Sequence, residues 1–441
     1  MTSPAGRGLV LSGGGLRGTF TAGALAYLFD QDGFYPEIVT GTSIGSWCGG
    51  TIAQARTPDE FQQAARGLRM AMSTIAQPGV AVSPRPWVTQ LTTTHAGSDM
   101  KRIFMSGMVT PPPPDPTMDT DVLADQTSDH TSAGDVLALL GHLVTHPHLR
   151  KESPQHDSSL MLLDPIEAAW RGRTPNSPLA PIDQEAVRRP GLELRLTVTA
   201  LGDSCIRYVD QHGAVVEADG VTPAPGAPSP GVIEGMLASA SVPALFAPRA
   251  IGDDVYVDGG IVQNIPLTPA IDAGAQEVIA VLAEERLCPP PDRDYATTDL
   301  LSVAYRAQSY VAFFDQQRRD LAAGAATGIP TTVIEPIVDV VGAFDPDERR
   351  MTINWEYGWM RAAAARATAT PDDRVAAEQA ADRVTIGRAR LAWFDGGAAA
   401  SSEGLSESVE SARRLVTDNL AVLHSLGLPL PPGELRDQVP V

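Results

Sequence analysis

The chain has 441 residues, of which 43% are hydrophobic, enough to build one large domain or two ordinary ones. Its net charge of −20 argues against general nucleic-acid binding and against wholesale adhesion to an anionic bilayer, because like charges repel. The three widely spaced cysteines suggest neither a disulfide framework nor a zinc site, and no signal peptide or long apolar run is apparent, so we expect a cytoplasmic protein.

The first fifty residues have the pattern that opens an α/β fold with a parallel sheet. Residues 8–12 are a short apolar run that ends in glycines, which is typical of a buried strand, and residues 20–29 have helical apolar spacing. A second strand is predicted at 38–40 and a second helix at 44–54.

The character of the chain changes between residues 78 and 190. This segment holds the proline run 111–114 and six of the eight histidines, and one helix is predicted within it at 135–144. We interpret 78–190 as an insertion or lid beside the core. A disordered linker around 111–131 is the alternative.

Patterns typical of the core resume near residue 192. After residue 351 the chain is rich in Ala and Arg with helical spacing. We therefore predict a main domain over 1–345 and a mainly helical C-terminal region over 346–441. The further elements predicted in the main domain are strands at 192–201, 255–257, 278–282 and 332–337, and a helix at 267–273.

A glycine-rich loop, Gly-Gly-Gly-Leu-Arg-Gly at 13–18, joins the first predicted strand to the first helix. Glycines let the backbone turn sharply and bring N–H groups close to a ligand, and the helix N-terminus adds positive partial charge. The loop can hold a phosphate or the oxyanion of an acyl transfer. Its G-x-G-x-x-G spacing also fits a dinucleotide site, although the acidic residue Glu37 precedes the second strand instead of ending it.

The second motif, Gly-Thr-Ser-Ile-Gly at 41–45, fits G-x-S-x-G at a predicted strand-to-helix turn. Small residues are needed beside a nucleophile in such a turn, because its backbone is strained and its neighbours are crowded. The N–H group that follows Ser43 can donate to an oxyanion. An ordinary glycine-rich turn is the alternative.

The third motif is Asp-Gly-Gly at 258–260, after a predicted strand. A serine hydroxyl needs a base, which is usually a histidine held by a carboxylate. No histidine has a comparable strand-end context: His212 lies in a predicted turn and His424 in the C-terminal helical region. Asp258 is placed like a site residue, with a plain turn as the alternative.

Together and in this order, the three motifs resemble those of the patatin-like phospholipase family. The segments 238–243 (Ala-Ser-Ala-Ser-Val-Pro) and 264–267 (Asn-Ile-Pro-Leu) are also similar, and the resemblance spans roughly 7–54 and 193–282. It implies a three-layer α/β/α fold with a mostly parallel sheet. It also implies hydrolysis of acyl ester bonds in lipids, often phospholipids, by a Ser–Asp dyad without a histidine or a cofactor.

The resemblance also implies roles for individual residues. Ser43 attacks the ester carbonyl, and Asp258 accepts its proton and later activates water. Burial must raise the low pKa of such a base, or the dyad must work by orientation. Arg17 orients the loop or meets a phosphate, with a structural salt bridge as the alternative. The oxyanion and substrate-binding residues are Gly13, Gly14, Gly15, Arg17, Gly18 and Ile44, with Gly14, Gly15 and Ile44 as N–H donors; the supporting glycines are Gly41, Gly45, Gly259 and Gly260.

One departure from the family is Trp47-Cys48, where smaller residues are usual, so we expect less space behind the nucleophile. Two alternatives to the hydrolase stay open: a nucleotide-binding oxidoreductase, and a patatin scaffold gated by a ligand or partner. The expected partner is a lipid or ester substrate, at a membrane surface or free, and no nucleic acid; the oligomeric state is not predicted. No metal site is predicted, because Pro147 interrupts the histidines at 142, 146 and 148.

Overall fold

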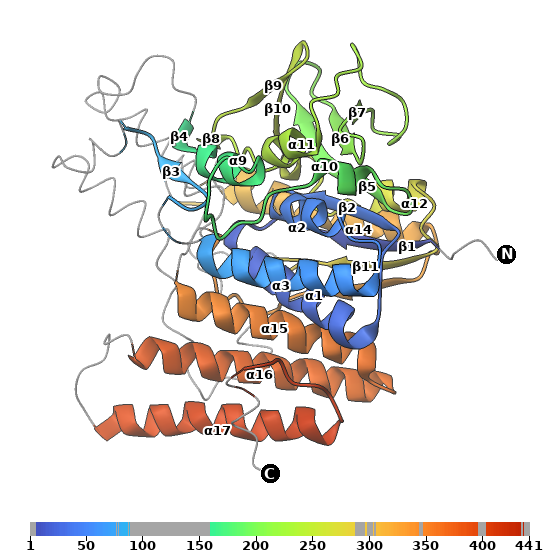
Figure 1. Cartoon of the computed structure of the whole chain (residues 1–441). Coiled ribbons are helices and arrows are strands. Elements are labelled where there is room, and N and C mark those ends of the chain that lie inside the picture. Colours follow the sequence, from blue (N-terminus) through green and yellow to red (C-terminus); the bar gives the residue numbers. More distant parts are fainter. Residues whose placement is uncertain are drawn as a thin grey trace.

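The computed structural model describes residues 6–75, 79–86, 159–286, 306–343, 347–395 and 403–433, with a few single positions between them (Figure 1). The helix predicted at 135–144, the proline run 111–114 and most of the predicted insertion lie outside the described residues. No helix in the described part is long and apolar enough to cross a bilayer.

Within the described residues, a nine-stranded sheet has the order β12-β11-β1-β2-β5-β10-β9, and β6 and β7 extend it from β5. The pairs from β12 to β5 are parallel, whereas β10, β9, β6 and β7 pair antiparallel. The strands are β1 (Arg7–Leu11), β2 (Ile38–Thr42), β5 (Glu193–Ala200), β6 (Ile206–Asp210), β7 (Val215–Val216), β9 (Arg249–Ile251), β10 (Asp254–Asp258), β11 (Glu277–Val281) and β12 (Thr331–Ile334).

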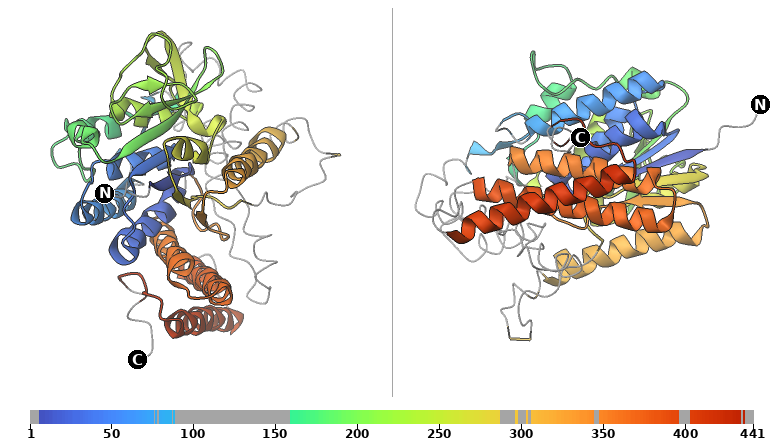
Figure 2. Two further views of the ribbon diagram at one scale, coloured as in Figure 1. Left: turned by 90° about the vertical axis from the view of Figure 1, so that its right-hand side faces the viewer. Right: turned by 90° about the horizontal axis from the view of Figure 1, so that it is seen from below.

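Helices cover both faces of this sheet, which the alternation of side chains in the strands requires. In β1, Leu9 and Leu11 join one apolar cluster and Val10 joins another. The larger cluster includes side chains of α1 (Gly18–Tyr27), α2 (Ile44–Ile52), α3 (Pro58–Ile75), α11 (Val232–Ser239) and α15 (Glu348–Ala367), and the smaller one those of α12 (Leu267–Asp272) and α14 (Ala312–Ala326). Figure 2 shows the layers from two further sides, and the predicted α/β/α class is confirmed.

The C-terminal helices stack outward from the sheet. Helix α15 packs on α1, α16 (Pro371–Asp395) on α15, and α17 (Glu403–Ser425) on α16 (Figure 1). Glycines let α1 and α15 touch through their backbones: a Cβ on Gly23 would lie 1.8 Å from Trp355 O. The helices predicted after residue 351 are thus observed. The domain boundary at 345/346 falls among residues outside the description and stays a prediction.

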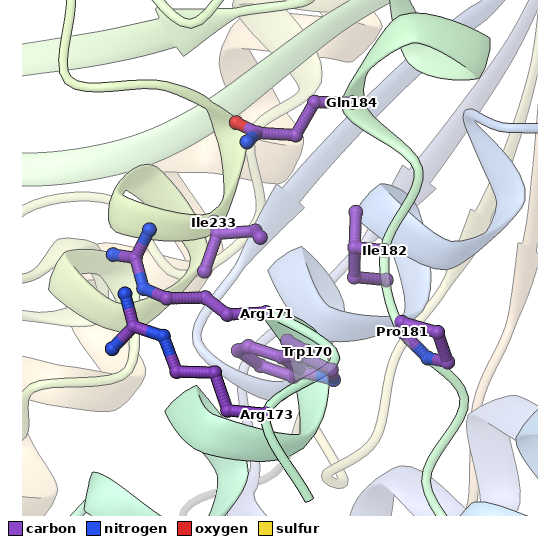
Figure 3. A pocket seen from close by; sticks show the side chains of 7 residues that line it. All are labelled: Trp170, Arg171, Arg173, Pro181, Ile182, Gln184 and Ile233. Atoms are coloured by element: carbon purple, nitrogen blue, oxygen red, sulfur yellow. The ribbon is translucent and has the colours of Figure 1, made fainter.

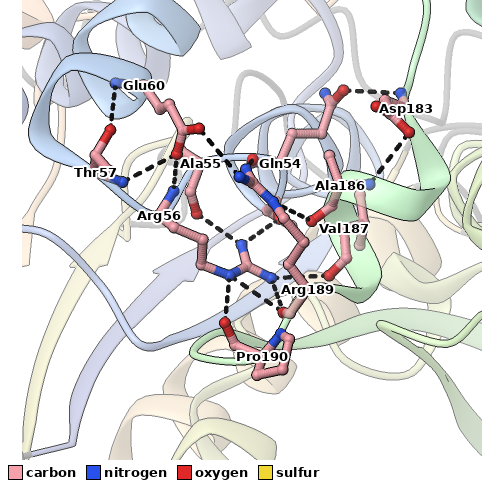
Figure 4. Close-up of polar contacts among 11 residues, drawn as sticks. Gln54, Ala55, Arg56, Thr57, Glu60, Asp183, Ala186, Val187, Arg189 and Pro190 are labelled. Carbon is pink, nitrogen blue, oxygen red and sulfur yellow. Dashed lines mark hydrogen bonds and ion pairs between the residues drawn. The ribbon is translucent and has the colours of Figure 1, made fainter.

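The last part of the predicted insertion, residues 159–190, packs on the core. It contains β4 (Ser159–Leu162), α9 (Asp164–Trp170) and α10 (Gln184–Arg188); β4 lies between β3 (Ser83–Pro84) and β8 (Ala244–Phe246) in a second sheet. The guanidinium of Arg56, just past α2, donates to the carbonyls of Val187, Arg189 and Pro190 (Figure 4). These bonds hold the returning chain beside α2.

Candidate active site

Ser43 occupies the turn between β2 and α2, at the carboxyl edge of the parallel strands. Its backbone, with φ of 54° and ψ of −122°, is a conformation that residues other than glycine rarely adopt. The turn is tight enough to require glycine on both sides of the serine. A Cβ on Gly41 would lie 2.4 Å from Gly45 O, and one on Gly45 would lie 2.3 Å from Leu11 O.

Asp258 ends β10, two strands away from Ser43 in the sheet. Strand β5 lies between them: Thr42 pairs with Thr197 on one side of β5, and Asp258 pairs with Val198 on the other. The backbones of β2 and β10 are therefore roughly 10 Å apart, at two strand spacings. Side chains leaning over β5 can span that distance, so the register brings the hydroxyl and the carboxylate together.

The Asp258 carboxyl group is buried and incompletely hydrogen-bonded. Its Oδ1 accepts a hydrogen bond from the Gly260 N–H at 2.7 Å, while Oδ2 has no partner of regular geometry within the described residues. Burial raises the pKa of Asp258 to about 7, against the opposing effects of hydrogen bonds from the Ser43 hydroxyl and the Gly260 N–H. Ser43 therefore approaches the carboxylate closely enough to influence it without fully satisfying it.

The glycine loop at 13–18 crosses the same edge of the sheet. A Cβ on Gly13 would lie 3.2 Å from Ser43 Cβ, which places the loop against the serine. The Gly13 N–H is occupied, because it donates to Asn264 Oδ1 at 3.1 Å. Within the described part of the chain, no acceptor takes the N–H groups of Gly14 and Gly15. The N–H of Ile44, at the first position of α2, also has no partner inside its helix.

Two of the loop glycines allow close contacts. Gly15 has φ of +59°, and a Cβ there would lie 2.4 Å from Ala343 O. Gly18 begins α1, and its Cβ would meet Ile44 Cγ1 at 2.4 Å. Glycine is therefore needed at positions 15 and 18, because only a residue without a side chain lets the loop touch the serine turn and the chain near residue 343.

Arg17 is a buried member of the loop, and each of its three guanidinium nitrogens donates to a carboxylate. It donates to both carboxylate oxygens of Asp339, at 3.2 and 2.6 Å, and to Glu284 at 3.0 Å. Burial alone would lower the pKa of Arg17, but the carboxylates of Asp339 and Glu284 raise it above its ordinary value. This arrangement favours a structural salt bridge at Arg17 over contact with a phosphate.

A pair of serines that sequence reasoning did not single out supports the Ser43 backbone. The Ser43 N–H donates to Ser239 Oγ at 3.0 Å, and Ser239 Oγ lies 2.6 Å from Ser46 Oγ. Ser46 in turn donates to Gly41 O at 2.8 Å. Ser239 lies in the 238–243 segment that resembles the family, which was the available signal, but its role depends on α11 packing against α2.

Asn264 holds the glycine loop at Gly13, and Asp320 in turn holds the backbone beside Asn264. Asn264 Oδ1 accepts from Gly13, while its Nδ2 is buried without a partner among the described residues. The Asp320 carboxylate accepts the Ile265 N–H at 3.1 Å, and burial raises the pKa of Asp320 to about 7. Asn264 was noted only as supporting context. Asp320 gave no sequence signal, because helix α14 was not predicted.

The acidic residue considered for a dinucleotide site is at the wrong edge of the sheet. Glu37 precedes β2 and accepts from the backbone N–H of Arg7 at 3.2 Å, at the amino end of β1. The glycine loop lies at the opposite, carboxyl end of the same strand. Glu37 therefore cannot bind the ribose of a nucleotide whose phosphates rest on that loop.

Trp47 lies on α2, one helical turn after Ser43, and is buried against α9. Its ring meets that of Trp170 edge to face, with 4.9 Å between centroids. Trp170 also forms a wall of a hollow of about 300 Å³ (Figure 3). The hollow is lined by Trp170, Arg171, Arg173, Pro181, Ile182, Gln184 and Ile233.

The described residues contain no group of three or more His, Cys, Asp or Glu side chains that could hold a metal ion. The histidines at 142, 146 and 148 lie outside them.

Comparisons with known proteins complete the description of the site. The family model "Patatin-like phospholipase" matches residues 9–123 and 205–271, which include the glycine loop, Ser43 and Asp258. No curated protein sequence matches the chain. Among solved structures, VipD from Legionella pneumophila is 14% identical with a TM-score of 0.34, covering 96% of this chain and 85% of that one.

The type III effector ExoU is 16% identical with a TM-score of 0.22, covering 99% of this chain and 74% of that one. The ExoU–SpcU complex from Pseudomonas aeruginosa gives 15% and 0.21, with 96% and 69% covered. These structural likenesses are weak, whereas the family match includes all three sequence motifs. The matched residues thus form a patatin-like phospholipase domain, which makes the chain a hydrolase of lipid esters.

Proposed function

We propose that this protein is a serine acyl hydrolase that cleaves lipid acyl esters with a Ser43–Asp258 dyad, through an acyl-enzyme. The observation that carries the proposal is a serine in a strained turn beside a buried carboxylate, one oxygen of which has no partner among the described residues. Buried polar atoms without partners are rare in folded proteins, and together with a raised pKa they are typical of reactive sites.

In the first step, Asp258 Oδ2 takes the proton of the Ser43 hydroxyl as Oγ attacks the ester carbonyl carbon. The N–H groups of Gly14, Gly15 and Ile44 bind the oxyanion that forms. When the tetrahedral intermediate collapses, the C–O bond to the alcohol breaks. Asp258 gives its proton to the departing oxygen, so that the alcohol leaves and the acyl group stays on Ser43.

In the second step, a water molecule replaces the alcohol. Asp258 accepts a proton from this water as its oxygen attacks the acyl carbon, and the same N–H groups bind the second oxyanion. The intermediate collapses with return of the proton to Ser43 Oγ, releasing the fatty acid. A pKa of about 7 makes Asp258 a stronger base than an ordinary aspartate while leaving a large ionised fraction at neutral pH.

The test uses purified protein with two substrates, p-nitrophenyl butyrate and phosphatidylcholine vesicles. Wild-type protein should hydrolyse an acyl ester and react covalently with a fluorophosphonate at Ser43, located by peptide mass spectrometry. Ser43→Ala should lose both properties, and Ser73→Ala, an exposed serine on α3, should keep them. Turnover by Ser43→Ala close to that of the wild type would overturn the proposal.

The gated scaffold, which the 78–190 insertion and the C-terminal region motivated, stays a prediction; most of the insertion lies outside the described residues. The cytoplasmic location and action at a membrane surface likewise stay predictions. If the 78–190 insertion or the 346–441 region gates the site, an added lipid interface or ligand should change the rate of ester hydrolysis.

A further inference from the structure

A segment that follows β12, residues 335–343, runs against the glycine loop; we call it the strap. The Leu16 N–H donates to Ala343 O at 2.8 Å. The same carbonyl oxygen would lie 2.4 Å from a Cβ on Gly15, so strap and loop touch backbone to backbone. The family match ends before this segment, at residue 271.

An ion pair joins the strap to the loop a second time. Asp339 accepts two hydrogen bonds from Arg17, and the two side chains are only 12% and 7% exposed. A two-point pair between a planar guanidinium and a carboxylate fixes orientation as well as distance. Glu284, at 3.0 Å, adds a third contact to Arg17, so loss of Asp339 alone would not leave a buried cation without a partner.

Helix α15 anchors the strap on its other side. The Ile337 N–H donates to the Tyr357 hydroxyl at 3.0 Å, and Arg361 Nε donates to Glu335 O at 2.9 Å. The same helix is also bonded to α1, because Asn354 Nδ2 donates to Thr19 Oγ1 at 2.8 Å. The strap is therefore bound to a rigid helix at one end and to the glycine loop at the other.

The result is a loop held at both ends. Gly13 is bound by Asn264, and Leu16 and Arg17 are bound by the strap. Between them, the N–H groups of Gly14 and Gly15 are left to face a substrate. Oxyanion donors act only within about 2.7–3.1 Å of the charge they stabilise, and a misplacement of about 1 Å costs on the order of 100-fold in rate.

We propose that Asp339 is a positioning residue for the hydrolase: it holds Arg17, and through Arg17 it fixes the glycine loop in its oxyanion-binding shape. Arg17 thus serves the loop and does not contact a substrate phosphate. This inference rests on the proposed function for its kinetic consequence but not for its structural one, and the experiment below measures the two separately.

The kinetic arm compares Asp339→Asn and Arg17→Lys with wild type on p-nitrophenyl butyrate, which has no phosphate, and on phosphatidylcholine vesicles. We expect kcat to fall about 10- to 100-fold on both substrates, with KM changed less than about 3-fold. If Arg17 instead binds a phosphate, KM rises on the phospholipid alone and Asp339→Asn keeps its activity on the butyrate. That outcome would overturn the proposal.

A matched control exists near the C-terminal end of α15. Asp32 accepts from Arg366 of α15 at 3.1 Å, with side chains 13% and 24% exposed. Asp32→Asn should lower the melting temperature about as much as Asp339→Asn and leave kcat within about 2-fold, because the pair lies at the amino edge of the sheet. An equal loss of kcat in both variants would show general destabilisation and contradict a positioning role.

The structural arm needs no catalysis. Hydrogen exchange of the peptide that contains residues 12–18 should be faster in Asp339→Asn than in wild type and unchanged in Asp32→Asn. Arg17→Lys serves the same purpose if Asp339→Asn does not fold, because it keeps the charge and loses only the two-point geometry. Unchanged exchange in these loop variants would overturn the inference, whereas an inactive wild type with faster exchange would refute only the proposed function.

Discussion

Two buried aspartates, in different regions of the molecule, have pKa values shifted in the same direction and opposite surroundings. Asp382 of α16 is 2% exposed and accepts from the Tyr357 hydroxyl and from Arg361, which lies 3.4 Å away. Asp258 at the end of β10 is 4% exposed and has one regular donor, with Oδ2 unpaired among the described residues. Burial raises the pKa of Asp382 to about 6 and that of Asp258 to about 7.

The difference lies in the partners. Around Asp382 a cation and a hydroxyl offset the loss of hydration, and the network joins α15 to α16. Around Asp258 no cation among the described residues does so, and a serine hydroxyl, that of Ser43, donates to it. A raised aspartate pKa therefore occurs both in a structural network and at the proposed active site. The proposed active site differs in having a carboxylate oxygen without a partner among the described residues, next to the proposed nucleophile Ser43. Substitution of each aspartate should affect a different property.

The largest effect should follow Asp258→Asn. Without a base, the serine keeps its proton, so kcat/KM on p-nitrophenyl butyrate should fall by about 10³-fold. The matched control is Asp382→Asn, which should keep kcat/KM within about 2-fold. Asp258→Asn activity within 10-fold of wild type would remove the contrast between the two sites.

Asp382→Asn should instead lower stability. The substitution leaves the buried Arg361 with a weakened partner, at a cost of about 3 kcal/mol in the free energy of unfolding. Urea denaturation followed by fluorescence measures this loss. A change below about 0.5 kcal/mol would mean that the Asp382 network contributes little to the helical layer.

The pH profile of activity tests Asp258 as the ionised base. With a pKa of about 7, kcat/KM should rise roughly tenfold per pH unit below 7 and level off above it. Initial rates between pH 5 and 9, with stability checked at each pH, measure the profile. A profile that is flat from pH 5 to 8 would show that the active base has an ordinary carboxyl pKa.

The smallest effect concerns stability against pH. The folded protein binds the Asp258 proton more tightly than the unfolded chain, whose aspartate pKa is near 3.8. The contribution of Asp258 to the free energy of folding is therefore most favourable below pH 4. Its contribution to stability falls as pH rises from about 4 to 7. Asp258→Asn should therefore be more stable than wild type at pH 8, by about 1 kcal/mol after the unsatisfied amide is counted.

The amino-terminal elements could be predicted because their signals are local. Short apolar runs, glycines and helical spacing specify β1, the loop, α1, β2 and α2 within about fifty residues, and the predicted strand at 192–201 is observed as β5 (Glu193–Ala200). The predicted strand at 332–337 is observed as β12 (Thr331–Ile334), and residues 335–337 begin the strap instead. Helix α3 (Pro58–Ile75) was missed, although its buried side chains recur at helical spacing.

Local sequence patterns were enough to predict the fold class and to single out the residues proposed for catalysis: Ser43 in its glycine turn, Asp258 and the glycine loop. The contacts that support these residues could be found only in the folded chain. Asn264, Asp320 and Asp339 act on residues far away in the chain, and such long-range contacts leave no periodic or local trace in the sequence. Strand register and helix packing create these contacts, because they set which distant side chains share one dry edge of the sheet.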